Sequence, residues 1–153
     1  MNRALLGAVA ALSLLAGCSN SSETGAQTGA GGAIRPGSQE DLVANVGDRV
    51  LFDTDRSNIR ADQRPILERQ AAWMQQHSSV QVQVEGHADE RGTREYNLAL
   101  GQRRANSARD VLIAGGVAGG RIRTISYGKD RPVALGSDEA AWAQNRRAVT
   151  VVQ

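Results

Sequence analysis

The chain has 153 residues, of which 41% are hydrophobic and 22% are charged, a composition that suits one modest globular domain with short additions. A formal net charge of +2, spread over 18 basic and 16 acidic residues, is too small and too evenly mixed to indicate a nucleic-acid-binding protein. The better interpretation of the charges is a solvated surface. Because only 3% of the residues are aromatic, we expect a core of Val, Leu, Ile and Ala.

The N-terminal residues have the layout of a bacterial lipoprotein signal. The basic start MNR precedes about fourteen apolar or small residues, too few for a bilayer-spanning helix but suited to a signal peptide over residues 1–17. The segment LAGC, which ends at Cys18, matches the lipobox, in which the cysteine receives a diacylglycerol and an amide-linked acyl chain. Since two or three acyl chains anchor a protein stably, we expect a membrane tether at Cys18. The alternative is an ordinary signal peptide with an accidental cysteine.

Residues 18–39 are expected to form a flexible tether that begins at the lipidated cysteine. Ser, Gly, Thr and Ala dominate this segment, so it cannot form a core. About twenty such residues span roughly 25 Å on average, which would let the domain at 40–153 work at a distance from the membrane. Ser19 follows the cysteine where aspartate would act as a retention signal, and the common sorting rule of Gram-negative lipoproteins then favours the outer membrane.

Hydrophobic patterning predicts four short strands and two main helices in residues 40–153. Asp62 is the expected cap of the first main helix. The expected buried face of that helix is Leu67, Gln70, Ala71 and Met74. In chain order we expect a strand at 48–52, a helix from about 62, a strand at 80–85, a helix from Thr93 to Ala114, a strand at 121–128, a short helix at 139–145 and a strand at 146–152. This β-α-β-α-β-(α)-β order predicts an α+β, two-layer sandwich with both main helices on one face of a small four-stranded mixed sheet.

A helical projection of residues 93–114 places Arg104 on an apolar row. Leu100, Ala108 and Val111 lie along nearly the same line of the helix. An unpaired guanidinium is very costly to bury, so Arg104 needs a partner or a ligand. Asp89, in the glycine-flanked loop GHADERG ahead of the helix, is a candidate for a structural ion pair or a loop-to-helix bond.

His87 and Asp89 have a spacing that two metal ligands could share. The only other histidine, His77, lies at the end of an expected amphipathic helix, and no HExxH motif or cysteine cluster accompanies them. We therefore expect neither a metal site nor a cofactor.

Four segments closely resemble the family of peptidoglycan-associated lipoproteins, which carry an outer-membrane-protein-A-like (OmpA-like) C-terminal domain. The segments are the lipobox, FDTDRSNI at 52–59, GHADERGTREYNLALGQRRA at 86–105 and SYGKDRPVALGSDEAAWAQNRRAV at 126–149. Two positions depart from the family pattern. Arg94 stands where proline is common at the first helical position, and Trp142 stands where tyrosine is common.

The resemblance implies an outer-membrane lipoprotein on the periplasmic face, not an enzyme, that holds the diaminopimelate residue of the peptidoglycan stem. Asp89 and Arg104 match the two main ligand residues of the family. A carboxylate and a fork-shaped guanidinium suit the ammonium and carboxylate of the diaminopimelate side chain. Leu100 is expected to form an apolar wall beside Arg104, and His87 to shape the loop or to touch the ligand peptide. The resemblance further implies that Thr54 and Asp55 lie at the pocket rim.

The resemblance also implies partners in the Tol system, namely a periplasmic β-propeller protein and other Tol components. Two other classes of protein stay open. A lipid-anchored cell-wall hydrolase would need a nucleophile and a base or a pair of carboxylates, and no such arrangement is convincing in the sequence. A stator-type or secretion-type OmpA-like module would use the same fold chiefly for protein contacts.

Overall fold

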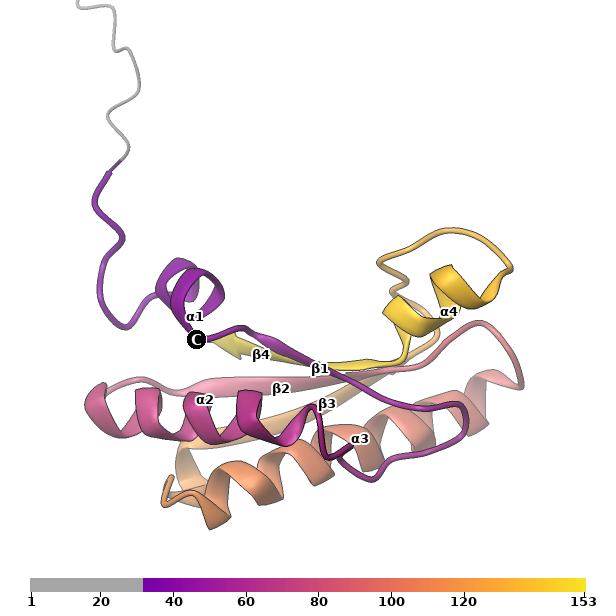
Figure 1. Cartoon of the computed structure of the whole chain (residues 1–153). Helices are drawn as coiled ribbons and strands as arrows, with labels where there is room; N and C mark the ends of the chain where they lie inside the picture. The colour runs from indigo at the N-terminus through magenta and orange to yellow at the C-terminus, as the bar shows by residue number, and fades with distance from the viewer. Residues whose placement is uncertain (1–31) are drawn as a thin grey trace, which may run out of the picture. The chain divides into compact units, whose positions relative to one another are not determined.

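The computed structural model describes residues 32–153, so the signal peptide expected at 1–17, the lipidated Cys18 and most of the tether lie outside the described residues. The described part contains helices and strands arranged around one sheet (Figure 1). None of its helices combines the length and the apolar composition that a bilayer crossing requires. In chain order the elements are α1 (Gln39–Asn45), β1 (Arg49–Leu51), α2 (Arg64–Gln76), β2 (Val82–His87), α3 (Arg94–Ala114), the 3₁₀ turn η1 (Gly119–Arg121), β3 (Ile122–Gly128), α4 (Glu139–Asn145) and β4 (Arg147–Val152).

The four strands form one mixed sheet in the spatial order β1-β4-β2-β3. Strand β4 pairs antiparallel with both β1 and β2, whereas β2 and β3 are parallel and are joined through α3. Helices α2 and α3 cover one face of the sheet, and the short helices α1 and α4 lie near its two opposite ends (Figure 1). The α+β two-layer arrangement expected from the sequence is confirmed.

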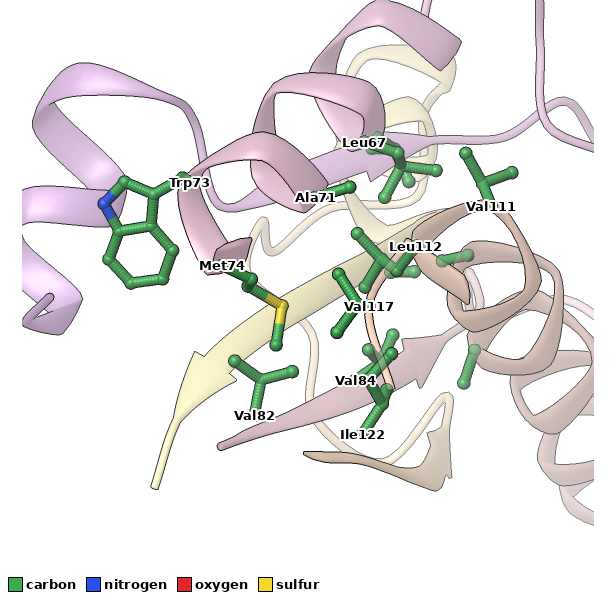
Figure 2. Packing of buried hydrophobic residues seen from close by; sticks show 14 of the residues in the cluster. Leu67, Ala71, Trp73, Met74, Val82, Val84, Val111, Leu112, Val117 and Ile122 are labelled. Carbon is green, nitrogen blue, oxygen red and sulfur yellow. The ribbon is translucent and has the colours of Figure 1, made fainter. Parts of the chain in front are cut away.

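The face of α2 expected to be buried packs against the sheet and α3. Leu67, Ala71 and Met74 meet Val82 of β2 and Leu112 of α3 in one hydrophobic cluster (Figure 2). The polar member of that face, Gln70, is also buried. Its amide nitrogen donates to the Gly47 carbonyl at 2.7 Å and its oxygen accepts from the Thr150 hydroxyl at 2.7 Å, so the amide is buried with its hydrogen bonds made.

Helix α3 runs over the residues that the sequence predicted, and it lies very close to β2. The Thr93 side chain caps it by accepting from the backbone N–H of Tyr96, and the helix begins at Arg94, the position where proline is common in the family. A Cβ atom on Gly101 of α3 would lie only 2.8 Å from the Gly86 carbonyl oxygen of β2. Two glycines therefore let the backbones touch, which brings the first half of α3 beside the end of β2.

Helix α1 is an element that the sequence did not predict. Ser38 caps it by accepting from the backbone N–H of Asp41 at 3.2 Å. The side chain of Gln39 donates to the Thr150 carbonyl and accepts from the Val152 N–H, so it bonds to the edge of β4. Packed structure thus begins at Ser38, just before the boundary expected at residue 40. Seven residues make two helical turns, which is too short for a periodic signal.

The expected cap of α2 is wrong by one residue. Gln63, not Asp62, is the N-cap residue, and it makes no capping bond with its side chain. The Asp62 carboxylate instead accepts hydrogen bonds from the side chains of Arg60 and Gln63. Pro65 lies within the first turn, as expected, where its missing N–H costs nothing.

Candidate functional site

Three segments meet at one end of the sheet, two of them consecutive in the sequence and the third about 35 residues earlier. They are the turn 53–56 after β1, the loop 88–92 after β2 and the first turns of α3. Because β1 and β2 are both antiparallel to β4, they run in the same direction and their following loops leave from the same edge. A pocket of about 300 Å³ lies between these segments; it is lined by Thr54, Asp55, Arg91, Gly92 and Tyr96.

Two of the expected site residues, Thr54 and Asp55, line this pocket. Thr54 accepts a hydrogen bond from Nη2 of Arg91 at 3.2 Å, and Asp55 accepts one from the Tyr96 hydroxyl at 3.2 Å. Asp55 has a φ angle of 55°, a left-handed conformation that aspartate tolerates better than most residues. The turn and the start of α3 are thus joined across the pocket by polar side chains.

Asp89 lies beside the pocket and pairs with Arg91. The guanidinium donates from Nε to Oδ1 at 3.1 Å and from Nη2 to Oδ2 at 2.7 Å, and Nη1 of Arg146 lies 3.5 Å from Oδ2. Burial raises the pKa of Asp89, but the hydrogen bonds from the side chain and backbone of Arg91 outweigh it, so the pKa falls below its usual value. Asp89 is therefore a carboxylate at neutral pH.

Arg104 is fully buried and is held by backbone carbonyls. Its Nε donates to the Arg56 carbonyl at 2.8 Å, Nη1 to the His87 carbonyl at 2.8 Å and Nη2 to the Asp53 carbonyl at 3.0 Å. No carboxylate of residues 32–153 lies within 4 Å of it, so the ion pair with Asp89 considered from the sequence is not formed. Burial lowers the pKa of Arg104 to about 10, partly offset by Asp89, so it stays charged at neutral pH.

The ring of His87 lies away from the pocket. Strand alternation directs Val82 and Val84 toward the helices and His87 to the other face, where its ring centroid is 5.6 Å from that of Tyr127 and its Nε2 is 3.6 Å from Glu85. Neither ring nitrogen has a hydrogen-bond partner among the described residues. Only the backbone of His87 reaches the site, through the bond from Arg104, so the expected contact between this side chain and a ligand is not supported.

Burial and nearby cations together keep His87 neutral. Burial, as the largest cause, and the positive charges of Arg147, Arg131 and Arg49 together lower its pKa to about 3. Glu85 is close, but it does not outweigh these effects.

Leu100 is buried and does not line the pocket, although it was expected as a wall of the site. Sequence reasoning overlooked Arg91 and Tyr96, which do line it. Arg146 was not among the predicted site residues; it is buried and donates to the Phe52 carbonyl at 2.9 Å and to Glu139 at 2.6 Å. A signal for Arg91 was present, because an arginine two residues after an aspartate in a tight loop can fold back on it.

Helix α4 braces the loop 88–92 from the side. The indole N–H of Trp142 donates to Glu90 at 3.0 Å, and the guanidinium carbon of Arg91 lies 4.0 Å from the centre of a Trp142 ring. Within the part of the chain that the structure describes, no three His, Cys, Asp or Glu side chains are grouped so that they could hold a metal ion.

Comparison with known proteins finds a family match and close relatives. The chain matches the OmpA family over residues 51–146, more than half its length. It is 56% identical to the peptidoglycan-associated lipoprotein of Rhizobium meliloti over 142 residues, which cover 90% of this chain and 81% of that relative. It is 58% identical to the peptidoglycan-associated lipoprotein of Brucella melitensis biotype 1 over 121 residues, which cover 79% of this chain and 72% of that relative.

A solved structure shows the same fold. The crystal structure of the peptidoglycan-associated lipoprotein from Burkholderia pseudomallei superposes with a TM-score of 0.69 at 41% sequence identity, covering 74% of this chain and all of that one. The names of these three proteins denote lipoproteins associated with peptidoglycan, and none of the three denotes an enzyme.

Replacing Arg104 with Met tests its structural role. The substitution leaves the carbonyls of Asp53, Arg56 and His87 without their donors, so we expect the free energy of unfolding to fall by about 2–4 kcal/mol. Urea denaturation measures it. The matched control is Arg103→Met, one position away on the exposed side of α3, which should change stability by about 0.5 kcal/mol or less. Equal stability of the two variants would contradict the bonding described for Arg104.

The buried neutral His87 predicts a specific loss of stability in acid. Its pKa rises from about 3 in the folded chain to the usual 6.5 on unfolding, so below pH 6.5 the unfolded state binds a proton that the folded state does not. Relative to His87→Phe, the wild type should lose up to about 1.4 kcal/mol per pH unit between pH 6.5 and pH 3. Denaturation at several pH values measures this. Parallel curves across that window would show that His87 is protonated in the folded protein.

Proposed function

The chain belongs to the OmpA family, and from that premise we propose that it is an outer-membrane lipoprotein that binds peptidoglycan without covalent chemistry and so ties the outer membrane to the cell wall. The observation that carries the proposal is the polar pocket at the end of the sheet, lined by Thr54, Asp55 and Arg91. Helix α1, which follows the tether segment, lies near the opposite end (Figure 1). A domain with this arrangement can hold a ligand while its N-terminal side leads to a membrane anchor.

The ligand that suits these charges is the diaminopimelate side chain of the peptide stem. It ends in an ammonium beside a carboxylate, so it needs one anion and one cation from the protein. Asp89 is a carboxylate next to the pocket, and Arg104 is a buried cation with no acidic partner within 4 Å among residues 32–153. A ligand carboxylate would supply the counter-charge that Arg104 lacks.

Arg104 can contact the ligand only if the turn 53–56 moves away from it. Two of the three hydrogen bonds of Arg104 go to carbonyls of that turn, and the same turn lines the pocket through Thr54 and Asp55. The ligand carboxylate would then replace these carbonyls as the acceptor. Charge-assisted bonds between guanidinium and carboxylate are stronger than those to a neutral carbonyl, which favours the exchange.

A partner in the Tol system, the periplasmic β-propeller protein, would dock at the same end of the molecule. The loop between β3 and α4 exposes two large apolar side chains, Val133 (51% exposed) and Leu135 (90% exposed). Leu135 lines a second, smaller pocket together with Ala88 and Glu90 of the loop 88–92, and exposed apolar side chains near that loop favour a protein partner. Competition between a muropeptide and the propeller protein for the full-length chain would test this assignment.

The pocket gives little support to a hydrolase. Its two hydroxyl groups belong to Thr54 and Tyr96, and both are in hydrogen bonds with pocket residues. No histidine is among the lining residues, and the His87 ring lies on the other side of the sheet. A hydroxyl without a neighbouring base is a weak nucleophile, so binding is the chemistry that the pocket favours.

Titration of the full-length protein with soluble muropeptides tests the ligand assignment. A muropeptide that carries diaminopimelate should bind, and one that carries lysine should bind at least tenfold more weakly because it lacks the terminal carboxylate. Amidating the diaminopimelate carboxylate should cost about 1.5–3 kcal/mol, the scale of a lost charge-assisted bond. Asp89→Asn should lose most of the binding, whereas Asp110→Asn, an exposed acid on α3, should not. Unchanged affinity for the amidated ligand would show that Arg104 does not bind the ligand carboxylate.

Replacing Cys18 with Ala tests the lipid anchor. The residues before it form a segment too short to remain as a membrane span, so the variant should leave the membrane fraction while the domain stays folded. Membrane fractionation after digestion of the cell wall measures this, with Ser19→Ala as the control. A Cys18→Ala chain that still sediments with wall-free outer membranes would contradict the proposed lipoprotein.

A further inference from the structure

Arg91 lines the pocket, and its guanidinium pairs with Asp89, the carboxylate that a ligand ammonium would need. Both oxygens of Asp89 accept from its guanidinium, at 3.1 Å and 2.7 Å. The Asp89 side chain is 9% exposed and the Arg91 side chain 40% exposed, so the arginine forms the outer cover of an almost buried acid. A ligand ammonium cannot approach Asp89 from the pocket while this pair is intact.

We propose that Arg91 is an internal competitor of the ligand, a cation that neutralises Asp89 in the empty site and is displaced when an ammonium group binds. This inference rests on the proposed function, because it concerns the group that Asp89 would hold. An ammonium and a guanidinium both donate charged N–H groups to a carboxylate, so one can replace the other without leaving Asp89 unpaired.

The second cation at Asp89 is not exchangeable in the same way. Arg146 is 7% exposed in its side chain, and it is held by the Phe52 carbonyl and by Glu139 as well as by Asp89. Its Nη1 lies 3.5 Å from Oδ2 of Asp89, a longer and weaker contact than those of Arg91. Arg146 therefore stays behind the carboxylate, while Arg91 lies on the side that opens to the pocket.

A displaced Arg91 has other partners within its reach. Its guanidinium carbon lies 4.0 Å from the centre of a Trp142 ring, which can hold a cation over its face. Its Nη2 already donates to Thr54 on the far side of the pocket at 3.2 Å. Asp89 raises the pKa of Arg91 most, and the charges of Glu139 and Asp55 add to that effect, so two further acids surround the side chain. Release from Asp89 thus does not leave the guanidinium without favourable contacts.

The consequence for binding is an exchange of one cation for another. The ligand ammonium can bind Asp89 only after the pair between Arg91 and Asp89 has broken and Arg91 has turned to the solvent and to its alternative partners. The free energy lost with that pair offsets part of the attraction between the ligand and the carboxylate. A variant without the competing charge should bind the ligand more tightly. A residue that contacted the ligand directly would have the opposite effect, which makes the sign of the change decisive.

The test titrates the full-length protein, held in mild detergent, with the tripeptide L-alanyl-γ-D-glutamyl-meso-diaminopimelate. Arg91→Gln keeps a hydrogen-bonding side chain but removes the charge, and we expect its affinity to rise about three- to tenfold over the wild type. The matched control is Arg94→Gln. That arginine is three positions further on, it pairs with Asp130 at 2.8 Å and it does not line the pocket, so its affinity should stay within about twofold.

The outcomes separate the competitor role of Arg91 from the proposed binding of the diaminopimelate side chain. Wild-type binding with equal or weaker binding by Arg91→Gln overturns the competitor role and leaves the proposed function standing. Tighter binding by Arg91→Gln alone supports the competitor role. The absence of binding by both proteins overturns the proposed ligand and, with it, this inference. As a readout of displacement itself, the Nε–H NMR signal of Arg91 should be protected from solvent exchange in the free protein and lose that protection at saturating tripeptide; unchanged protection would also overturn the role.

Discussion

The guanidinium of Arg104 joins three backbone carbonyls that belong to two segments far apart in the sequence, the turn after β1 and the end of β2. Only arginine offers enough donors, fixed in one plane, to reach carbonyls in three directions at once. A lysine in the same place could not span them. The pocket lies where these two segments are held side by side, and Arg104 is the buried side chain that bonds to both.

This bonding explains why a charged residue lies on the apolar row of α3. The row faces the sheet, and the guanidinium of Arg104 reaches the end of β2 and the turn after β1, where backbone carbonyls are available as acceptors. Carbonyl oxygens carry partial negative charge and partly compensate a buried cation without an acid. The charge is only partly compensated, since burial still lowers the pKa of Arg104 to about 10. The interior of the site therefore stays receptive to an anion.

The sequence could predict the elements and their faces better than the contacts within the site. The periodicity of α2 and α3 is long enough to identify buried positions such as Leu67, Met74 and Arg104, because one face of each helix meets the sheet. Helix α1 and the cap of α2 were not predictable in this way, since two turns and a single polar side chain carry too little signal. The resemblance directed attention to Thr54 and Asp55, which line the pocket.

The partners of Asp89 and the orientation of His87 depend on competition that a sequence does not show. Asp89 had a distant candidate in Arg104, but Arg91 is two residues away and reaches it with less loss of backbone freedom. His87 was read as part of a loop, whereas β2 continues through it and strand alternation then directs its ring to the other face. In both cases local geometry outweighed a plausible long-range role.

Strand β4 connects the two ends of the domain. At its last residues the Gln39 side chain bonds to Thr150 and Val152, and Arg146, the residue before its start, contacts Asp89 beside the pocket. Between these points β4 is an inner strand of the sheet, with β1 on one side and β2 on the other. A pull along the strand would load its ladder hydrogen bonds together rather than one after another. In the proposed function, with the membrane anchor on the side of α1 and the ligand at the pocket, the same inner strand that positions Arg146 would also carry tension between the two ends.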